Sequence, residues 1–277
     1  MPELPEVETI RRDLLPLLRG RSFTHAWVSP DAPRLVQAPS PAEFTRLLPG
    51  RRIEDVSRRG KYLVFRLSGG LHLAVHLRMT GALLHRLASA PPDRYVRAVL
   101  ALDDGSELRF SDLRKFGAMW LVPDPSLVLG RLGPEPLDGA MTPSALREAT
   151  ARRRAPIKSV LLDQRALAGL GNIYADEALF AAGLHPQRPA SSLSEAEVER
   201  LHGAIRQVLV AALDDRGASF SDYVDASGRE GRHQFRVQVF RRTGQPCYAC
   251  GGEIERVKVA GRSSHFCPGC QPLEAGA

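Results

Sequence analysis

Hydrophobic residues recur at helical spacing near the start of the chain, at Val7, Ile10, Leu14 and Leu17. This period predicts a short amphipathic helix. Runs of β-forming residues follow at 61–67 and 70–77, and 98–102 is joined to 108–110 through Asp103-Asp104-Gly105, a favourable hairpin turn. The first large region is therefore predicted to be mainly β, as two packed antiparallel sheets.

The pattern changes after a stretch dense in proline and glycine, residues 123–143, which we interpret as a linker. Helical periodicity then returns in four segments, over 144–153, 157–164, 173–182 and 194–215. The last of these opens with the capping-box pattern Ser194-Glu195-Ala196-Glu197. The polar residues 217–233 that follow are expected to form a mobile loop.

All four cysteines of the chain lie near its C-terminus, in the pairs Cys247/Cys250 and Cys267/Cys270 with 16 residues between them. This spacing predicts a structural zinc site with four thiolate ligands and no open coordination position. A pair of redox or disulfide motifs is the alternative. The residues between the pairs read as a β-hairpin with Arg262 at its turn, where a guanidinium can meet a phosphate or simply face water.

The 277 residues carry a net charge of +7, which suggests a polyanionic partner such as nucleic acid. Only four of the 38 basic residues are lysines, so abundant arginine is weak evidence, whereas each lysine draws attention. The longest apolar runs, such as 208–213, are too short to span a membrane, and the chain start lacks the layout of a signal peptide. An intracellular protein is expected.

The chain start offers a candidate nucleophile. Removal of Met1 would leave Pro2 with a secondary α-amine, which titrates near roughly 7.7–8.0 and is far more often unprotonated at neutral pH than a lysine. Its attack on an aldehyde carbon gives an iminium that favours elimination. Glu3, and less directly Glu6, could move protons. Alternatively, Pro5 and Glu6 simply suit the first turn of a helix.

Taken together, four motifs resemble those of formamidopyrimidine-DNA glycosylases: residues 2–9, residues 59–62, residues 169–174 and the cysteine pairs. The resemblance runs from the first residue to the last cysteine. It implies a bifunctional enzyme of base excision repair that removes oxidised purines, such as 8-oxoguanine and ring-opened formamidopyrimidines. Such an enzyme then cuts the strand at the abasic site by β,δ-elimination.

The resemblance also implies an α+β fold in three domains. Residues 1–132 would form an N-terminal catalytic domain, a two-layer antiparallel β-sandwich with a helix. Residues 133–235 would form a helix-two-turn-helix domain with a lesion-recognition loop, and residues 236–277 a β-hairpin zinc finger with one structural Zn²⁺. A monomer in the bacterial cytoplasm, at the nucleoid, is expected, with damaged double-stranded DNA and no membrane as its partner.

Four residues match the family's catalytic positions. The resemblance implies that the Pro2 amine attacks C1′ of the damaged nucleotide and that Glu3 protonates or orients the sugar. Lys61 would bind the phosphate beside the lesion and assist β-elimination, unless it is an ordinary strand-end lysine. Arg262 would grip phosphates from the zinc hairpin and serve the δ-elimination.

Other matches concern DNA contacts. Met79, Arg114 and Phe116 match a trio that fills the gap left by an extruded base, although Met79 and Phe116 taken alone would more often be core residues. His76 is a weaker candidate for a phosphate contact. Tyr95 stands where the family pattern has a histidine, so it can donate a hydrogen bond but carries no charge.

The helical region supplies three further candidates for DNA binding. Asn172, in the glycine-rich turn before a helix, could hold a phosphate together with the helix N–H groups. Arg153 and Lys158 match basic positions of the preceding segment. An ordinary glycine-rich helix connection and solvent-facing arginines are the alternatives.

Two other functions fit part of the pattern. The endonuclease VIII type of glycosylase shares the Pro-Glu start and prefers oxidised pyrimidines, but Leu4 and the long 217–233 loop favour the purine enzyme. A non-enzymatic zinc-ribbon protein that binds DNA is the second alternative. It leaves the Pro2-Glu3 pair and Lys61 without a role.

Overall fold

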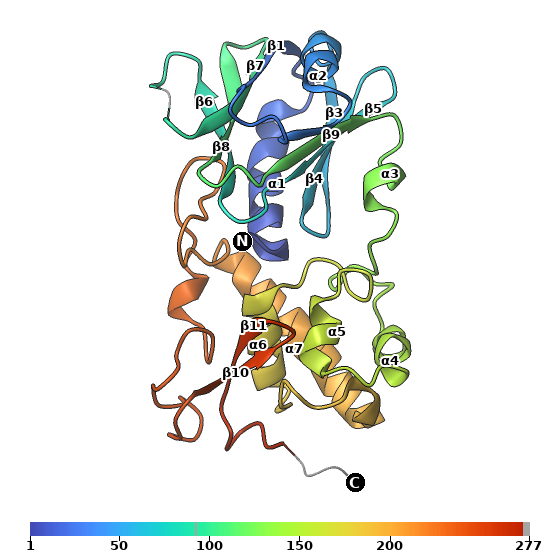
Figure 1. Cartoon of the computed structure of the whole chain (residues 1–277), viewed down its shortest axis with the longest axis vertical. Helices are drawn as coiled ribbons and strands as arrows, with labels where there is room; N and C mark the ends of the chain where they lie inside the picture. Colours follow the sequence, from blue (N-terminus) through green and yellow to red (C-terminus); the bar gives the residue numbers. More distant parts are fainter. Residues whose placement is uncertain (92, 274–277) are drawn as a thin grey trace. The chain divides into compact units, whose positions relative to one another are not determined.

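The structure is a computed structural model that describes residues 1–91 and 93–273, and its chain divides into two units (Figure 1). Unit 1 consists of Met1–Arg131 and Leu213–Gln234. Unit 2 consists of Leu132–Ala212 and Phe235–Ala277. The sequence led us to expect the 217–233 loop in the helical domain and a separate zinc finger, whereas by contacts the loop belongs to unit 1 and the zinc hairpin to unit 2.

Unit 1 begins with a helix and continues as strands. Its elements up to the central turn are α1 (Leu4–Leu18), β1 (Phe23–Val28), β2 (Val36–Ala38), α2 (Pro41–Leu47), β3 (Ile53–Arg59) and β4 (Tyr62–Leu67). They are followed by β5 (Leu71–His76), β6 (Gly81–Leu87), β7 (Val96–Leu102), β8 (Ser106–Asp112), β9 (Ala118–Val122) and the short α3 (Ser126–Leu129).

The strands of unit 1 form two sheets, in the orders β1-β7-β8-β6 and β2-β9-β5-β4-β3. Neighbouring strands are antiparallel, except that β2 pairs with β9 in parallel. The apolar face of α1, with Val7, Ile10, Leu14 and Leu18, joins both sheets in one buried core. The predicted α+β class with two β layers is confirmed.

Unit 2 carries the helices and the zinc hairpin. Its helices are α4 (Pro143–Ala151), α5 (Ile157–Leu162), α6 (Asn172–Ala181) and α7 (Glu195–Asp214), whose last two residues belong to unit 1, and its strands are β10 (Glu255–Val259) and β11 (Arg262–Phe266). Two 3₁₀ turns lie at Ala190–Ser192 and His233–Phe235. The predicted capping box is present, since Ser194 N donates to a carboxylate oxygen of Glu197 at 2.7 Å. The helix α6 is buried on nearly all sides, which is why its sequence shows little helical amphipathicity.

The segment 217–233 was predicted to be a mobile loop, but it carries its own hydrogen bonds. The carboxylate of Asp225 accepts the backbone N–H groups of Ser227 and Arg229, each at 2.9 Å, and pairs with the Arg216 guanidinium at 2.7 Å. Tyr223 lies in the core of unit 1. The segment is therefore a built part of unit 1.

Within residues 1–91 and 93–273, no helix is both long enough and apolar enough to cross a membrane.

Candidate active site and nucleic-acid interface

The chain start is held by two buried carboxylates. Glu3 and Glu6 are 3% and 1% exposed. The Glu6 carboxylate accepts the backbone N–H of Glu3 at 2.7 Å and that of Ala218 at 2.8 Å. Glu6 thus closes the first turn of α1, as the structural alternative expected, and also binds the 217–233 segment to the chain start.

The α-amine of Met1, at the chain start, has a lowered pKa. Burial is the main cause; the carboxylates of Glu3, Glu6 and Asp222 oppose it, and the charge of Lys61 adds to it. These interactions bring Glu3 and Lys61, two predicted catalytic residues, within electrostatic reach of the terminal amine. They also add Asp222, which the sequence did not single out. Because Met1 precedes it, the Pro2 nitrogen is here part of a peptide bond.

Lys61 and His76 lie at neighbouring strand ends. Lys61 occupies the tight turn between β3 and β4 and is only 5% exposed, and the next residue, Tyr62, pairs with His76 across β4 and β5. Burial lowers the pKa of His76 to about 3, and the charges of Arg78 and Lys61 add to this. The Nδ1 atom of His76 accepts the Arg78 N–H at 2.9 Å. A neutral His76 can therefore offer only its Nε2–H to a phosphate.

The predicted gap-filling trio is exposed. Met79 is 39% and Phe116 is 53% exposed, and Arg114 is exposed as well. Met79 follows β5, whereas Arg114 and Phe116 lie in the turn between β8 and β9, with the guanidinium 4.7 Å from the centre of the Phe116 ring. The alternative that Met79 and Phe116 are core residues is therefore wrong.

Tyr95 directly precedes β7 and is half-buried. The guanidinium of Arg94 lies over its ring, 4.5 Å from the centre. Its carbonyl accepts the N–H of Asp112 at 2.9 Å. Tyr95 is thus connected through the backbone to the turn that carries Arg114 and Phe116.

The structure argues against a direct DNA contact for Lys158. This residue is fully buried, and its ammonium lies 2.6 Å from a carboxylate oxygen of Asp176 and 2.7 Å from the Ser263 carbonyl. A buried, paired charge of this kind holds structure together. Arg153 differs, since its side chain is 40% exposed and donates to Asp163 at 2.7 Å.

Asn172 and Arg262 come together at the zinc hairpin. The Asn172 side-chain nitrogen donates to the Ser263 carbonyl at 3.0 Å. Arg262 is the exposed first residue of β11, one position before Ser263. The turn itself is formed by Ala260 and Gly261, both with positive φ, so Arg262 follows the turn instead of standing in it as predicted.

Two adjacent acids on α6 bind the C-terminal part of unit 2, Asp176 at the zinc hairpin itself and Glu177 at the segment that precedes it. Glu177 accepts the backbone N–H groups of three consecutive residues, Gln238, Val239 and Phe240. Asp176 accepts the N–H of His265 at 3.0 Å, and its carboxylate also lies 3.0 Å from Nδ1 of that ring. Sequence reasoning missed both acids, although two consecutive acids inside a largely apolar helix are a recognisable signal.

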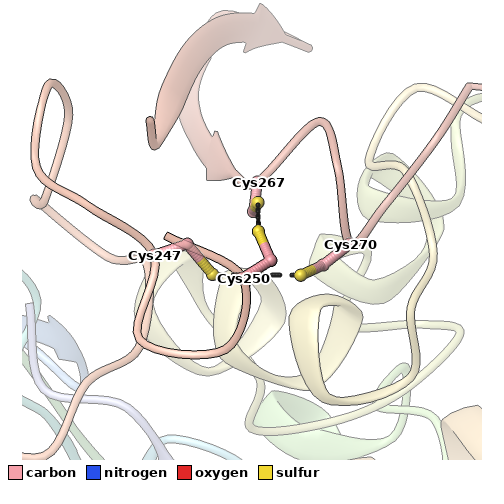
Figure 2. Close-up of side chains that lie close together, drawn as sticks. All are labelled: Cys247, Cys250, Cys267 and Cys270. Atoms are coloured by element: carbon pink, nitrogen blue, oxygen red, sulfur yellow. Dashed lines mark hydrogen bonds between the residues drawn. The ribbon is translucent and has the colours of Figure 1, made fainter. Parts of the chain in front are cut away.

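The four cysteines converge as a metal site (Figure 2). Their sulfur atoms all lie within 4.8 Å of one another, with 3.4 Å between Cys250 and Cys267 and 3.9 Å between Cys247 and Cys270. A tetrahedron with metal–sulfur bonds of about 2.3 Å has edges of about 3.8 Å, so the geometry fits zinc and is far too open for disulfide bonds. These residues hold one structural zinc.

Three family models match successive parts of the chain. The model of the formamidopyrimidine-DNA glycosylase N-terminal domain matches residues 1–119, and that of the formamidopyrimidine-DNA glycosylase H2TH domain matches residues 132–223. The chain belongs to the formamidopyrimidine-DNA glycosylase family. A model described as a zinc finger found in FPG and IleRS matches residues 244–273, the cysteine hairpin.

Curated members of the family match over the whole chain. The formamidopyrimidine-DNA glycosylase of Symbiobacterium thermophilum is 50% identical over 100% of this chain and 91% of its own length. That of Moorella thermoacetica is 52% identical over 93% of this chain and 95% of its own length.

Solved structures of the family share the fold. The MutM (Fpg) protein of Thermus thermophilus is 45% identical, with a TM-score of 0.87 and 98% of each chain covered. The Lactococcus lactis Fpg in complex with DNA containing Fapy-dG is 35% identical, with a TM-score of 0.90 over 98% of this chain and 100% of that one. The same Lactococcus protein was also solved with DNA containing an abasic site.

Proposed function

We propose that this chain is a bifunctional DNA glycosylase and AP lyase of base excision repair that removes oxidised purines, 8-oxoguanine and formamidopyrimidines among them. The observation that carries the proposal is the chain start, where Pro2 directly precedes the buried Glu3 and where the charges of Glu3 and the buried Lys61 both act on the Met1 α-amine. The complexes of the Lactococcus enzyme with Fapy-dG and abasic DNA support the substrate class.

In the first step the Pro2 nitrogen, freed by loss of Met1, bonds to C1′ of the damaged nucleotide while the glycosidic bond breaks, and the departing base takes up the proton that the Pro2 nitrogen loses. Glu3 protonates the sugar ring oxygen, the ring opens, and a cationic iminium joins Pro2 to C1′. Burial lowers the pKa of the Met1 α-amine at this chain start, and a shift in the same direction at the Pro2 amine would favour its unprotonated, nucleophilic form.

The iminium then acidifies the C2′–H bond. Loss of that proton breaks the C3′–O bond, and loss of the C4′ proton next breaks the C5′–O bond, which completes the β,δ-elimination. Lys61 holds the adjacent phosphate in the first elimination and Arg262 in the second.

DNA binding is distributed over both units. Met79, Arg114 and Phe116 fill the gap left by the extruded base, and His76, Tyr95, Arg153 and Asn172 contact the backbone. Asn172 fits this role because an amide nitrogen carries two hydrogens, and the bond to Ser263 uses one. The structural zinc keeps the Arg262 hairpin folded. The protein acts as a monomer in the bacterial cytoplasm, at the nucleoid.

Borohydride trapping tests the proposal. Borohydride reduces an iminium to a stable amine, so a duplex with 8-oxoguanine opposite cytosine should become cross-linked to Pro2, as identified by mass spectrometry of the N-terminal peptide. The variant Pro2→Gly keeps a terminal amine, but this amine is primary instead of secondary. Its yield of cross-linked DNA should be lower than that of the wild-type protein. A cross-link only on thymine glycol duplexes would indicate the pyrimidine enzyme, and none on either would refute the covalent mechanism.

A further inference from the structure

Asp112, the last residue of β8, receives an unusual set of hydrogen bonds. It is 1% exposed. One carboxylate oxygen accepts the Thr80 hydroxyl and the backbone N–H of Arg114 at 3.1 Å, and the other accepts the N–H of Gly117 at 2.8 Å. All three donors lie in turns, and the Thr80 side chain is 32 residues away along the chain.

These donors belong to the two turns that carry the exposed trio. Thr80 directly follows Met79, while Arg114 and Gly117 enclose Phe116. The Thr80 hydroxyl oxygen also accepts the Arg114 N–H at 3.1 Å, so the two turns are joined twice. A single carboxylate therefore fixes Met79, Arg114 and Phe116 relative to one another.

The backbone of Asp112 extends this arrangement to Tyr95. Its N–H donates to the Tyr95 carbonyl at 2.9 Å, and its carbonyl accepts from the Arg97 guanidinium at 3.0 Å. Asp112 thus bonds to segments that carry all the DNA-contact candidates at this end of unit 1 except His76.

Gly117 has no room for a side chain. A Cβ on Gly117 would lie 2.2 Å from the Phe110 ring and 3.2 Å from the Asp112 carboxylate. The Gly117 backbone therefore packs closely against the Phe110 ring and the Asp112 carboxylate. An asparagine at 112 would have to place its NH₂ group against the N–H of Gly117 or that of Arg114, since only one side of an amide accepts; the Thr80 hydroxyl can turn to accept, but neither N–H can.

We propose that Asp112 is a positioning residue that holds the Met79, Arg114 and Phe116 side chains in the geometry needed to extrude a base from duplex DNA. This inference rests on the proposed function. Asp112 acts through the trio and does not touch the reacting atoms. Its loss should therefore impair steps that need an intact duplex and spare the chemistry at an abasic site that is already unstacked.

The experiment compares Asp112→Asn with the wild-type protein on two DNA substrates. Single-turnover excision of 8-oxoguanine from a duplex should fall by about tenfold or more, because a buried acceptor is replaced by a donor. Cleavage of a single-stranded oligonucleotide with a preformed abasic site should stay within about twofold, the spread usual for neutral substitutions. A 2-aminopurine beside the lesion should show a smaller fluorescence rise on binding.

Asp124→Asn is the matched control. Asp124 is also a turn aspartate of unit 1, accepting Ser126 N at 2.8 Å, but it does not contact the trio. It should leave both activities unchanged. Thr80→Val removes one of the three donors to Asp112. It should also slow excision from the duplex and spare cleavage of the single-stranded abasic substrate, with a smaller loss of duplex activity than Asp112→Asn. This variant therefore tests the proposal if Asp112→Asn fails to fold.

Three results have distinct meanings. Equal losses on duplex and single-stranded substrates would mean that Asp112 only supports the fold and would overturn the proposal. Unchanged rates on both would do the same. If the wild-type protein itself cut neither substrate, the proposed enzymatic function would fail first, and the inference with it.

Discussion

Replacing Lys158 by methionine should destabilise unit 2 strongly. Methionine keeps most of the volume of the side chain but leaves the Asp176 carboxylate buried without its cation. At 2.6 Å and an effective dielectric constant of about 20, the two charges attract each other by ~6 kcal/mol. Part of that attraction offsets the cost of burying them, and breaking such a pair from one side costs about 3–5 kcal/mol.

The loss can be measured by urea unfolding of the zinc-loaded protein. Zinc release, detected with a chromogenic chelator, reports on unit 2, whereas both tryptophans, Trp27 and Trp120, lie in unit 1 and provide a separate fluorescence signal. With a urea dependence of about 2 kcal/mol per molar, the midpoint of zinc release should move down by about 2 M.

Lys258→Met is the control, because Lys258 is an exposed lysine on β10 of the same unit. The reasoning would be refuted if the free energy of unfolding of Lys158→Met, measured by zinc release, lay within about 0.5 kcal/mol of that of this control. Adding Asp176→Leu to Lys158→Met removes the unpaired charge but also deprives the His265 N–H of its acceptor. The double variant should therefore recover stability only in part.

Three further predictions concern zinc, Glu6 and His76. Zinc chelation should unfold the cysteine hairpin and abolish DNA binding, as followed by hydrogen exchange and a binding assay; tight binding by metal-free protein would contradict a structural role for the metal. Glu6→Gln should lower the free energy of unfolding by ~1–3 kcal/mol in thermal melts, because the NH₂ group of the glutamine must face the N–H of Glu3 or that of Ala218. The control Glu54→Gln changes a residue of an exposed ion pair and should alter the free energy of unfolding little. The pKa of His76 in the folded state is about 3, below the ordinary 6.5, so between these two pH values the unfolded chain binds more protons than the folded one. The free energy of unfolding should therefore fall as the pH drops from 6.5 toward 3, and it should fall less in His76→Gln. A His76 imidazole that titrates near 6.5 by NMR would disprove the lowered pKa.

Local patterns in the sequence predicted much of the fold. The apolar period of the first helix, the capping box at Ser194 and the two Cys-x-x-Cys pairs each depend on residues a few positions apart. They therefore identified α1, α7 and the zinc site with small errors at the ends. The turn of the zinc hairpin was placed one residue too late, because Ala260 was not expected to adopt positive φ.

The residues that sequence reasoning missed act over long separations. Asp112 meets Thr80 across 32 residues, and Asp176 meets His265 across 89. No local period marks such a partner. Lys158 shows the mixed case: the scarcity of lysine correctly drew attention to it, but only the fold reveals that Asp176 neutralises it in the interior.

The proposed mechanism requires a free Pro2 nitrogen, which a peptide bond to Met1 blocks. Under the proposed mechanism, removal of Met1 is the step that frees this nitrogen. Any extension of the chain before Pro2 would keep this nitrogen acylated. A purification tag therefore belongs at the C-terminus, and an N-terminally tagged protein is a ready-made inactive form for trapping the enzyme on intact lesions.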